Sequence, residues 1–326
     1  MRAIQIEAHG GPEQLQLVDL PVPEPKAGEV RVRHHAIGVN FLDVYHRTGL
    51  YKAALPLVLG TEGAGVIDAV GAGVTHLAVG DRVGYAARTP GSYAEARTLD
   101  SAQVVKLPDA IDFEHAAAMM LKGLTVQFLL ERTLPVGGLH AGDAILWHAA
   151  AGGVGLIACQ WAKALGLALI GTAGSAAKCE LATRHGAAHV IDYSKADVVA
   201  RVRELTGGKG VKAVYDSVGK DTWDRSIDCL APLGLMVSFG NASGPPPLVS
   251  LPALMVKGSL YVTRPTLQTH IATRELVEDG SRRLFEMVAG GKVTIEVGAK
   301  FPLQDAAKAH VAMEARKTTG STILTV

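Results

Sequence analysis

The stretch from Ala144 to Gly166 reads AILWHAAAGGVGLIACQWAKALG, and its pattern decides the fold of the chain. It begins with a short apolar run, 144–149, which predicts a strand. A turn that contains Gly152, Gly153 and Gly155 follows. From Gly155 the apolar residues recur every four positions, at Ile157, Trp161 and Leu165. This spacing predicts a helix, so the stretch is a strand, a tight turn and a helix.

The glycines of this turn predict a dinucleotide-binding site. Gly152 allows the backbone to approach a diphosphate, and Gly155 allows the helix to pack closely on the strand. The free N–H groups of the first helical turn then face the anion. The dinucleotide fingerprint is G-x-G-x-x-G, and Ala150 replaces its first glycine. A purely structural turn is the alternative, but the strand–turn–helix context favours cofactor binding.

Length and composition limit the number of domains, the partners and the cellular compartment to be expected. A chain of 326 residues predicts two domains, and a net charge of +1 gives no electrostatic reason to expect nucleic acid or a membrane surface. The sequence has no apolar run long enough to span a bilayer, and residues 1–5 have no apolar targeting core. The cysteines, Cys159, Cys179 and Cys229, are odd in number and widely spaced, which favours reduced thiols in a cytoplasmic protein.

The pattern of elements changes near residue 124. Residues 1–123 are rich in glycine and proline, with strand patterns at 30–33, 66–70 and 78–83, which predicts a β-rich, barrel-like domain. Helices are expected at 113–118 and 124–132. From 124 to 264 strands alternate with helices, which predicts an α/β fold with a doubly wound parallel sheet.

The individual elements of the second region follow from local patterns. Strands are expected at 168–173, 189–192, 213–218, 235–239 and 260–263, and helices at 176–185, 196–206 and 222–230. Pro245 to Pro247 predict a loop. The tail from 265 is expected to hold one helix, at 274–289, and to end in a strand at 321–326 that returns to the first domain.

The end of the second strand of the sheet indicates which dinucleotide binds. An NAD site places Asp or Glu about 20 residues past the glycines, to hold the ribose 2′-hydroxyl. The window 172–178 reads TAGSAAK and contains no acid. Ser175 as a donor and Lys178 as a cation suit the 2′-phosphate of NADPH. The alternative is that Lys178 is a solvated helix lysine.

Several motifs together resemble a family. They are HAAAGGVG at 148–155, VYDSVG at 214–219, VSFG at 237–240, YVTRP at 261–265, AIGVNFLDVY at 36–45 and GTEGAG at 60–65. Over its whole length the chain resembles the zinc-free medium-chain dehydrogenases/reductases, in the NADPH:quinone oxidoreductase (zeta-crystallin-like) branch. The resemblance implies a catalytic GroES-like domain from 1–123 with 265–326, and a Rossmann NADPH-binding domain over 124–264.

Metal is not expected. Zinc members of the family carry ligands near positions 40, 61 and 120, where this chain has Asn40, Thr61 and Met120, and the four-cysteine lobe is missing. Catalytic zinc needs about three ligands from Cys, His or carboxylate. Histidines such as His34, His35 and His148 are expected to be structural.

The resemblance also implies site residues. Those around the nicotinamide would be Asn40, Phe41, Asp43, Tyr45 and Thr125; those at the diphosphate Gly152, Gly153 and Val154; those around the 2′-phosphate Gly174, Ser175, Lys178 and Tyr193; those at later strand ends Ser217, Phe239, Gly240 and Asn241; and those at the domain border Arg264 and Arg316. Tyr45 and Phe239 have the alternative of core aromatics, and Arg316 that of a solvated charge. Asn40 and Arg264 stand in apolar stretches, so each must be hydrogen-bonded if it is buried.

The implied activity is NADPH-dependent reduction of quinones by hydride or single electrons, with no dedicated acid or base. Asn40 and Tyr45 are the candidate donors to a quinone oxygen. The alternative enzyme is a 2-alkenal or enoyl reductase, with Tyr45 or Tyr51 as the acid. An alternative of another class is an NADPH-binding structural or RNA-binding protein. The strand at 258–263 ends the sheet, and an exposed edge favours pairing. The resemblance implies that such edges pair across a two-fold axis, so we expect a homodimer.

Overall fold

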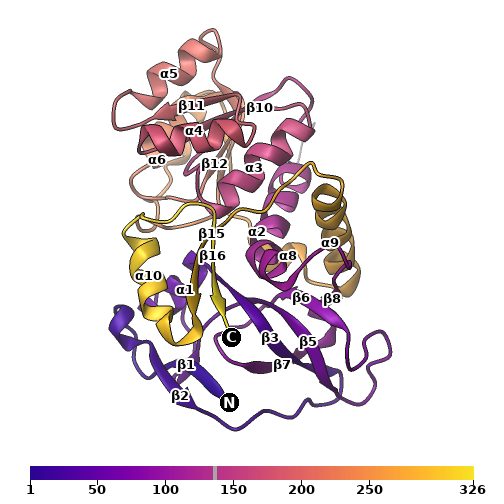
Figure 1. The fold of residues 1–326 in the computed structure, drawn as a ribbon. Coiled ribbons are helices and arrows are strands. Elements are labelled where there is room, and N and C mark those ends of the chain that lie inside the picture. The colour runs from indigo at the N-terminus through magenta and orange to yellow at the C-terminus, as the bar shows by residue number, and fades with distance from the viewer. Residues whose placement is uncertain (135–137) are drawn as a thin grey trace. The chain divides into compact units, whose positions relative to one another are not determined.

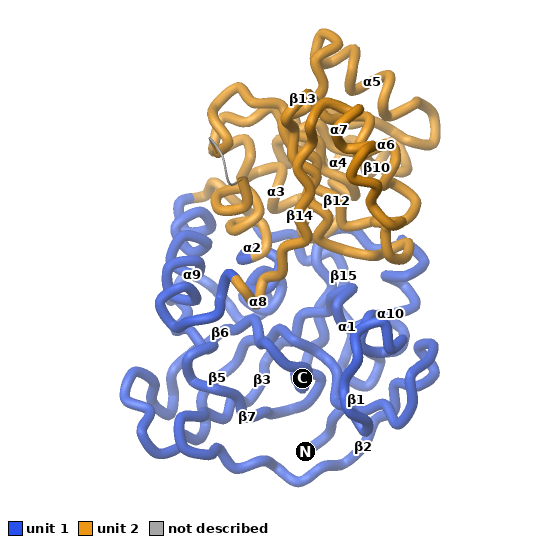
Figure 2. Tube along the Cα trace, turned by 180° about the vertical axis from the view of Figure 1, so that it is seen from behind, with its two compact units in different colours: residues 1–124, 270–290, 295–326 blue, residues 125–269, 291–294 orange. Residues whose placement is uncertain are grey.

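The computed structural model of the protein describes residues 1–134 and 138–326, which form two compact units. Figure 2 colours them separately. Unit 1 comprises residues 1–124, 270–290 and 295–326, and unit 2 comprises residues 125–269 and 291–294. Unit 1 is therefore assembled from three separate segments of the chain.

Unit 2 contains a sheet of six parallel strands, in the order β11-β10-β9-β12-β13-β14. The strands are β9 (Ala144–Trp147), β10 (Ala168–Ala173), β11 (His189–Asp192), β12 (Val211–Asp216), β13 (Leu230–Ser238) and β14 (Tyr261–Thr263). Counted along the chain, the order is 3-2-1-4-5-6, which is the doubly wound arrangement that the alternation of strands and helices predicts.

Helices connect these strands (Figure 1). They are α3 (Gly153–Ala164), α4 (Ala176–Arg184), α5 (Val198–Leu205) and α6 (Trp223–Cys229), and the short α7 (Leu251–Val256) precedes β14. Alternate side chains of the strands, among them Leu146, Ile170, Val214 and Met236, form one buried apolar cluster with α5 and α6. This cluster holds the sheet rigid, so the loops at the strand ends have a fixed support.

Unit 1 contains a seven-stranded sheet in the order β15-β16-β3-β5-β6-β8, with β7 paired to β3, and a smaller sheet in the order β2-β1-β4. The strands are β1 (Arg2–Ile6), β2 (Gln16–Asp19), β3 (Glu29–Val39), β4 (Leu57–Val58), β5 (Glu62–Val70), β6 (Arg82–Ala86), β7 (Ala96–Asp100), β8 (Val104–Lys106), β15 (Val297–Pro302) and β16 (Ser321–Thr325). Because β16 pairs with β3, the predicted return of the C-terminal strand to the first part of the chain is confirmed.

The helices that start in or belong to unit 1 are α1 (Phe41–Thr48), α2 (Phe113–Arg132), α9 (Arg274–Ala289) and α10 (Ala306–Glu314), and the four-residue α8 (Leu267–His270) ends at its boundary. Three predictions need correction here. The two helices expected at 113–118 and 124–132 are one helix, α2. The tail holds α8 and α10 besides α9. The strand expected at 78–83 begins only at Arg82. The loop predicted at Pro245 to Pro247 is confirmed, and α7 follows it.

Candidate functional site

The candidate residues of unit 2 follow the ends of its strands. The glycine turn follows β9, Gly174 and Ser175 follow β10, Tyr193 follows β11, Ser217 follows β12, Phe239 to Asn241 follow β13, and Arg264 follows β14. All six strands are parallel, so their carboxyl ends meet at one edge of the sheet. The structure therefore brings these residues to the edge where doubly wound sheets bind ligands. Thr125 lies elsewhere in unit 2, on α2.

Two glycines of the turn differ in how tightly the surrounding protein constrains them. A Cβ at Gly155 would lie 2.5 Å from the carbonyl oxygen of Ala149, so close packing within the protein itself requires this glycine. A Cβ at Gly152 would lie 3.3 Å from the same oxygen, and the backbone of Gly152 is extended at φ −80°. A Cβ at Gly152 would thus be a tight contact, but the protein itself constrains this position less than it constrains Gly155. Gly152 precedes a helix N-terminus, which suits the diphosphate of a dinucleotide.

The backbone beside this turn is strained. Ala149 has a φ of +55°, in the left-handed region that costs a residue with a Cβ about 1–2 kcal/mol. It follows His148, a buried histidine whose ring contacts Thr172 Oγ1 at 3.0 Å and Ser226 Oγ at 2.9 Å. Both ring nitrogens of His148 have partners, so this histidine is structural and holds the end of β9, as expected for it.

The end of β10 has no carboxylate and carries the N-terminus of α4. Ser175 is the N-cap of α4, and its hydroxyl accepts a hydrogen bond from Lys178 N at 3.4 Å. The Lys178 side chain is half-buried, and Tyr193 is half-exposed. A Cβ at Gly174 would lie 2.5 Å from the Tyr193 hydroxyl, so Gly174 and Tyr193 are neighbours. The four residues predicted for the 2′-phosphate thus lie at two adjacent strand ends.

Two arginines complete the candidate cofactor set. Arg264 is exposed, and its Nη1 donates to the carbonyl oxygen of Ser238 at 3.1 Å. The expectation that a buried Arg264 must be hydrogen-bonded therefore does not apply, because this side chain is not buried. Arg316 is exposed and has a φ of +57° directly after α10. Its N–H donates to Met313 O, and Lys317 N–H donates to Ala312 O, both at 3.0 Å. This is the Schellman motif, whose left-handed position is usually glycine.

In unit 1, Asn40 begins α1 and is held by two buried carboxylates. Asn40 Nδ2 donates to Glu62 Oε2 at 2.8 Å, and Asn40 N donates to Asp43 Oδ2 at 2.8 Å. Glu62 is also bound by Leu121 N at 2.7 Å and by Lys122 Nζ at 3.2 Å. The expectation that a buried Asn40 is hydrogen-bonded is confirmed, and its amide is oriented with Nδ2 toward Glu62.

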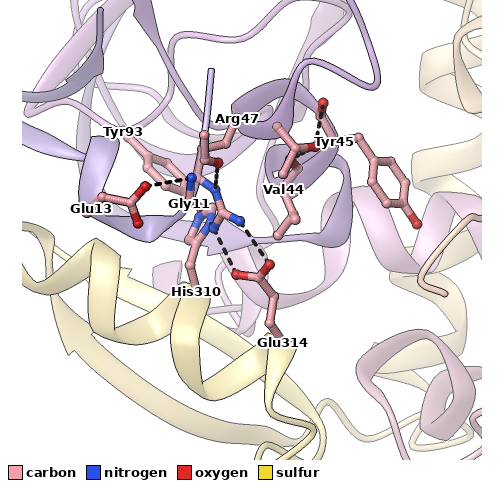
Figure 3. A network of polar contacts seen from close by, with 10 residues as sticks. Gly11, Glu13, Val44, Tyr45, Arg47, Tyr93, His310 and Glu314 are labelled. Carbon is pink, nitrogen blue, oxygen red and sulfur yellow. Dashed lines mark hydrogen bonds and ion pairs between the residues drawn. The ribbon is translucent and has the colours of Figure 1, made fainter. Parts of the chain in front are cut away.

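Asp43 connects Asn40 to a second group of polar side chains. Figure 3 shows members of this group, among them Tyr93, Arg47 and His310. Asp43 has no exposed surface, and the hydroxyl of Tyr93 donates to its Oδ2 at 3.0 Å. The same hydroxyl lies 3.0 Å from His310 Nε2, and Arg47 Nη1 lies 3.0 Å from His310 Nδ1. Arg47 in turn binds both carboxylate oxygens of Glu314, at 2.8 and 2.9 Å.

Aromatic residues lie on α1 beside this network. Tyr45 is buried, its ring centroid is 5.3 Å from that of Tyr51 in an edge contact, and it is 6.4 Å from the ring of Phe41. Figure 3 shows the Tyr45 ring lying apart from the Arg47 group. The burial of Tyr45 is therefore consistent with its alternative role as a core aromatic. Phe239 is only half-buried, and its ring centroid lies 5.5 Å from that of Trp147, so it is less fully a core residue than Tyr45.

Sequence reasoning missed the supports of Asn40 and Asp43. They are Glu62, Tyr93, Lys122, Arg47 and His310. The one local signal was the pair Asn40 and Asp43, an Asn with an acid three residues later directly before an apolar helix, which is typical of a capping box. The other partners are distant in sequence, so no local pattern indicates them.

The three positions where zinc members carry ligands hold buried Asn40, Thr61 and Met120. Among residues 1–134 and 138–326, no group of three or more His, Cys, Asp or Glu side chains could hold a metal ion. In the same ranges no helix is both long enough and apolar enough to cross a membrane. A metal-free reaction remains a prediction, for which elemental analysis is the measurement.

Comparison with known proteins agrees with this geometry. Residues 26–109 match the alcohol dehydrogenase GroES-like domain, and residues 153–278 match the zinc-binding dehydrogenase family. The chain is 55% identical to the quinone oxidoreductase of Pseudomonas aeruginosa, over 99% of both chains, and 43% identical to the 2-haloacrylate reductase of a Burkholderia species, over 99% of this chain and 98% of the relative. The crystal structure of Escherichia coli quinone oxidoreductase complexed with NADPH has a TM-score of 0.97 and 50% identity, covering all of both chains.

Proposed function

The chain belongs to the quinone oxidoreductase family of zinc-free medium-chain dehydrogenases/reductases, and from this premise we propose that it reduces quinones with NADPH. The observation that carries the proposal is the glycine turn at the start of α3, which lies at the carboxyl edge of the parallel sheet, where doubly wound sheets bind ligands. When bound, NADPH would supply the hydride. The protein supplies binding and orientation.

Each group of candidate residues has a role in this proposal. The turn at Gly152 to Val154 holds the diphosphate at the N-terminus of α3, and Ser175 and Lys178 hold the 2′-phosphate. The lack of an acid in the window 172–178 favours NADPH over NADH. Asn40, Phe41, Asp43, Tyr45 and Thr125 are assigned to the surroundings of the nicotinamide. Asp43 is fully buried, so it acts through its hydrogen bond with Asn40 N.

The quinone needs little chemistry from the chain. It is an electron-poor ring that accepts hydride or single electrons without prior protonation, and its oxygens can take protons from solvent. Asn40 Nδ2 carries two hydrogens, one of which goes to Glu62. The second hydrogen, with the hydroxyl of Tyr45, is our proposed donor set for a quinone oxygen.

A second candidate activity is the reduction of an activated carbon–carbon double bond. It is favoured by the edge contact of Tyr45 and Tyr51, because one phenol of such a pair can protonate the carbon next to the one that receives hydride. A relative named 2-haloacrylate reductase also belongs to this family.

One experiment separates these activities. NADPH oxidation is followed with a panel of benzoquinones, naphthoquinones, 2-alkenals, haloacrylates and enoyl thioesters, before and after treatment with a chelator. We expect turnover with quinones that the chelator does not change. The Gly152→Val variant, folded but unable to admit the diphosphate, is the control and should be inactive. Turnover with the alkenes alone would favour the second activity, and NADPH binding by Gly152→Val would show that the site is misplaced.

The proposal includes a homodimer that forms through unit 2. β14 is the last strand of the six-stranded sheet, and none of the six residues of the neighbouring α7 is buried. Large apolar side chains are exposed there, at Leu233, Leu248, Leu251, Met255, Val256 and Tyr261. Such a cluster beside a sheet edge is typical of a protein–protein interface. We also place the protein in the cytoplasm, since Cys159, Cys179 and Cys229 are all free thiols.

A further inference from the structure

The hydrogen bonds that end at Asp43 have a fixed direction. An arginine can only donate, so His310 Nδ1 accepts from Arg47 and the ring proton of His310 is on Nε2. His310 Nε2–H then donates to the Tyr93 oxygen, and the Tyr93 hydroxyl donates to Asp43 Oδ2. Since Asn40 N also donates to this oxygen, Asp43 Oδ2 is fully used as an acceptor.

The other oxygen of the Asp43 carboxyl, Oδ1, has a different environment. Asp43 Oδ1 is buried and has no hydrogen-bond partner within the part of the chain that the structure describes. It is therefore the atom that can carry a proton without breaking an existing hydrogen bond. An unpartnered carboxylate oxygen in the interior is costly when it is charged, and protonation relieves that cost.

The charges around Asp43 leave its ionisation finely balanced. Burial raises the pKa of Asp43 to about 7, the bonds from Asn40 N and Tyr93 and the positive charge of Lys122 on α2 lower it, and the negative charge of Glu62 on β5 raises it. Arg47 faces Asp43 only through His310 and Tyr93, and burial lowers the pKa of His310 to about 3, so this histidine stays neutral. A modest added charge near Asp43 would therefore decide whether it holds a proton.

We propose that Asp43 binds and releases a proton with the oxidation state of the cofactor, holding it on Oδ1 beside NADPH and losing it to solvent beside NADP⁺. The inference rests on the proposed function, which places the nicotinamide near Asn40 to Tyr45. The oxidised ring is positively charged and the reduced ring is neutral, and a nearby cation favours an ionised carboxyl. The O–H bond of Asp43 breaks, its electron pair stays on the carboxylate, and the proton leaves to the medium. The carboxylate then compensates the positive charge.

The test is thermodynamic linkage rather than activity. The dissociation constants of NADP⁺ and NADPH are measured by calorimetry from pH 5.5 to 8.5, and the ratio of the two constants is followed as a function of pH. The 2′-phosphate also titrates, near pH 6, but it is common to both cofactors and cancels in the ratio. We expect the affinity for NADP⁺, relative to the affinity for NADPH, to increase on the order of tenfold as the pH rises through 7. Asp43→Asn should abolish this gain, because its amide takes up no proton in this pH range.

Two further variants test Asp43 even if Asp43→Asn does not fold. Tyr93→Phe removes a hydrogen bond to the ionised form, so the midpoint of the change should move to higher pH. Glu62→Gln removes a negative charge, so the midpoint should move to lower pH. A merely structural role would not move it in opposite directions. A ratio that is independent of pH in the wild type, or a change that persists in Asp43→Asn, would overturn the inference. Failure of the wild type to bind either cofactor would overturn the proposed function instead.

Discussion

At the scale of single residues, we propose that the choice of cofactor depends on Lys178. We expect Lys178→Ala to weaken NADPH binding by roughly tenfold to a hundredfold, because one charge-assisted contact to the 2′-phosphate is lost. NADH lacks this phosphate and should be almost unaffected. The measurement is kcat/KM for both cofactors with one saturating quinone. An equal loss for both cofactors would show that Lys178 is structural.

Gly174 allows a stronger change, and the structure shows what must accompany it. Gly174→Asp adds repulsion against the 2′-phosphate and an acceptor for the ribose hydroxyl of NADH. Its Cβ would lie 2.5 Å from the Tyr193 hydroxyl, so the tyrosine has to move. The matched comparison is therefore Gly174→Asp with Tyr193→Ala against Tyr193→Ala alone. The double variant should prefer NADH.

His310 makes the stability of the fold depend on pH. Burial lowers the pKa of His310 to about 3 and that of His34 to about 4, below the unfolded value of 6.5. Each histidine thus contributes stability above pH 6.5 that is lost as the pH falls toward its folded pKa. Asp43 acts in the opposite sense, since its raised pKa removes stability as the pH rises from 3.8 through about 7.

We therefore expect His310→Gln to flatten the fall in stability below pH 6.5. A glutamine amide can accept from Arg47 and donate to Tyr93 as the neutral ring does, but it takes up no proton. The slope that is removed is at most about 1.4 kcal/mol per pH unit. Urea unfolding from pH 4.5 to 8 measures it, and the part due to His34 should remain. An unchanged slope would mean that His310 is protonated in the folded protein.

At this scale, the sequence predicts a residue's place when the signal is local. Gly174 and Ser217 could be placed because each directly follows a buried strand, and parallel strands end at one edge. The environment of Asn40 could be predicted only in part. The burial of Asn40 requires a hydrogen-bond partner, but that partner, Glu62, lies 22 residues away in the sequence. Further along the same network, His310 lies 217 residues from its partner Tyr93. Only the tertiary pairing of α1, β5 and α10 brings them together.

At the scale of elements, the end of α10 carries an arginine where glycine would be less strained. Arg316 occupies the left-handed position of the Schellman motif. We expect Arg316→Gly to stabilise the protein by about 1 kcal/mol, because the Cβ penalty of that conformation is removed. The same change should weaken NADPH about tenfold if Arg316 binds the cofactor. Urea unfolding and a dissociation constant give the two values.

Arg316→Ala is the control for this pair of effects. It keeps the strained conformation and removes only the guanidinium, so NADPH should weaken as in Arg316→Gly without a gain in stability. Unchanged NADPH affinity in both variants would remove Arg316 from the cofactor site and leave it as a solvated charge.

The corrected elements show why local patterns failed there. The two helices expected at 113–118 and 124–132 are joined as α2, which continues through Gly123. A Cβ at Gly123 would lie 2.5 Å from the side chain of Leu284 of α9. Close packing of α9 on α2, which no local pattern reveals, accounts for the glycine. The alanines of α10 give only a weak apolar stripe, so its burial between β15 and the N-terminal segment was not predictable.

At the scale of the whole molecule, the exposed apolar side chains of α7 should determine the oligomeric state. We expect the wild type to have twice the chain mass of 34.0 kDa by light scattering. The double variant Leu251→Glu, Val256→Glu should have the mass of a single chain, because the charges would be buried in the dimer. Val79→Glu, at an equally exposed apolar residue of unit 1, is the matched control and should remain a dimer. A monomeric wild type would overturn the proposal.

The place of β16 in its sheet has a consequence for biosynthesis. β16 pairs with β3 on one side and with β15 on the other, although it lies at the extreme C-terminus (Figure 1). A ribosome translates all six strands of the unit 2 sheet before it reaches β16. The nascent chain can therefore complete the unit 2 sheet first, while the edge of β3 that pairs with β16 stays open until β16 has been translated. Such an edge can pair with other chains. Holdase chaperones should thus engage the first-made part of this protein longest.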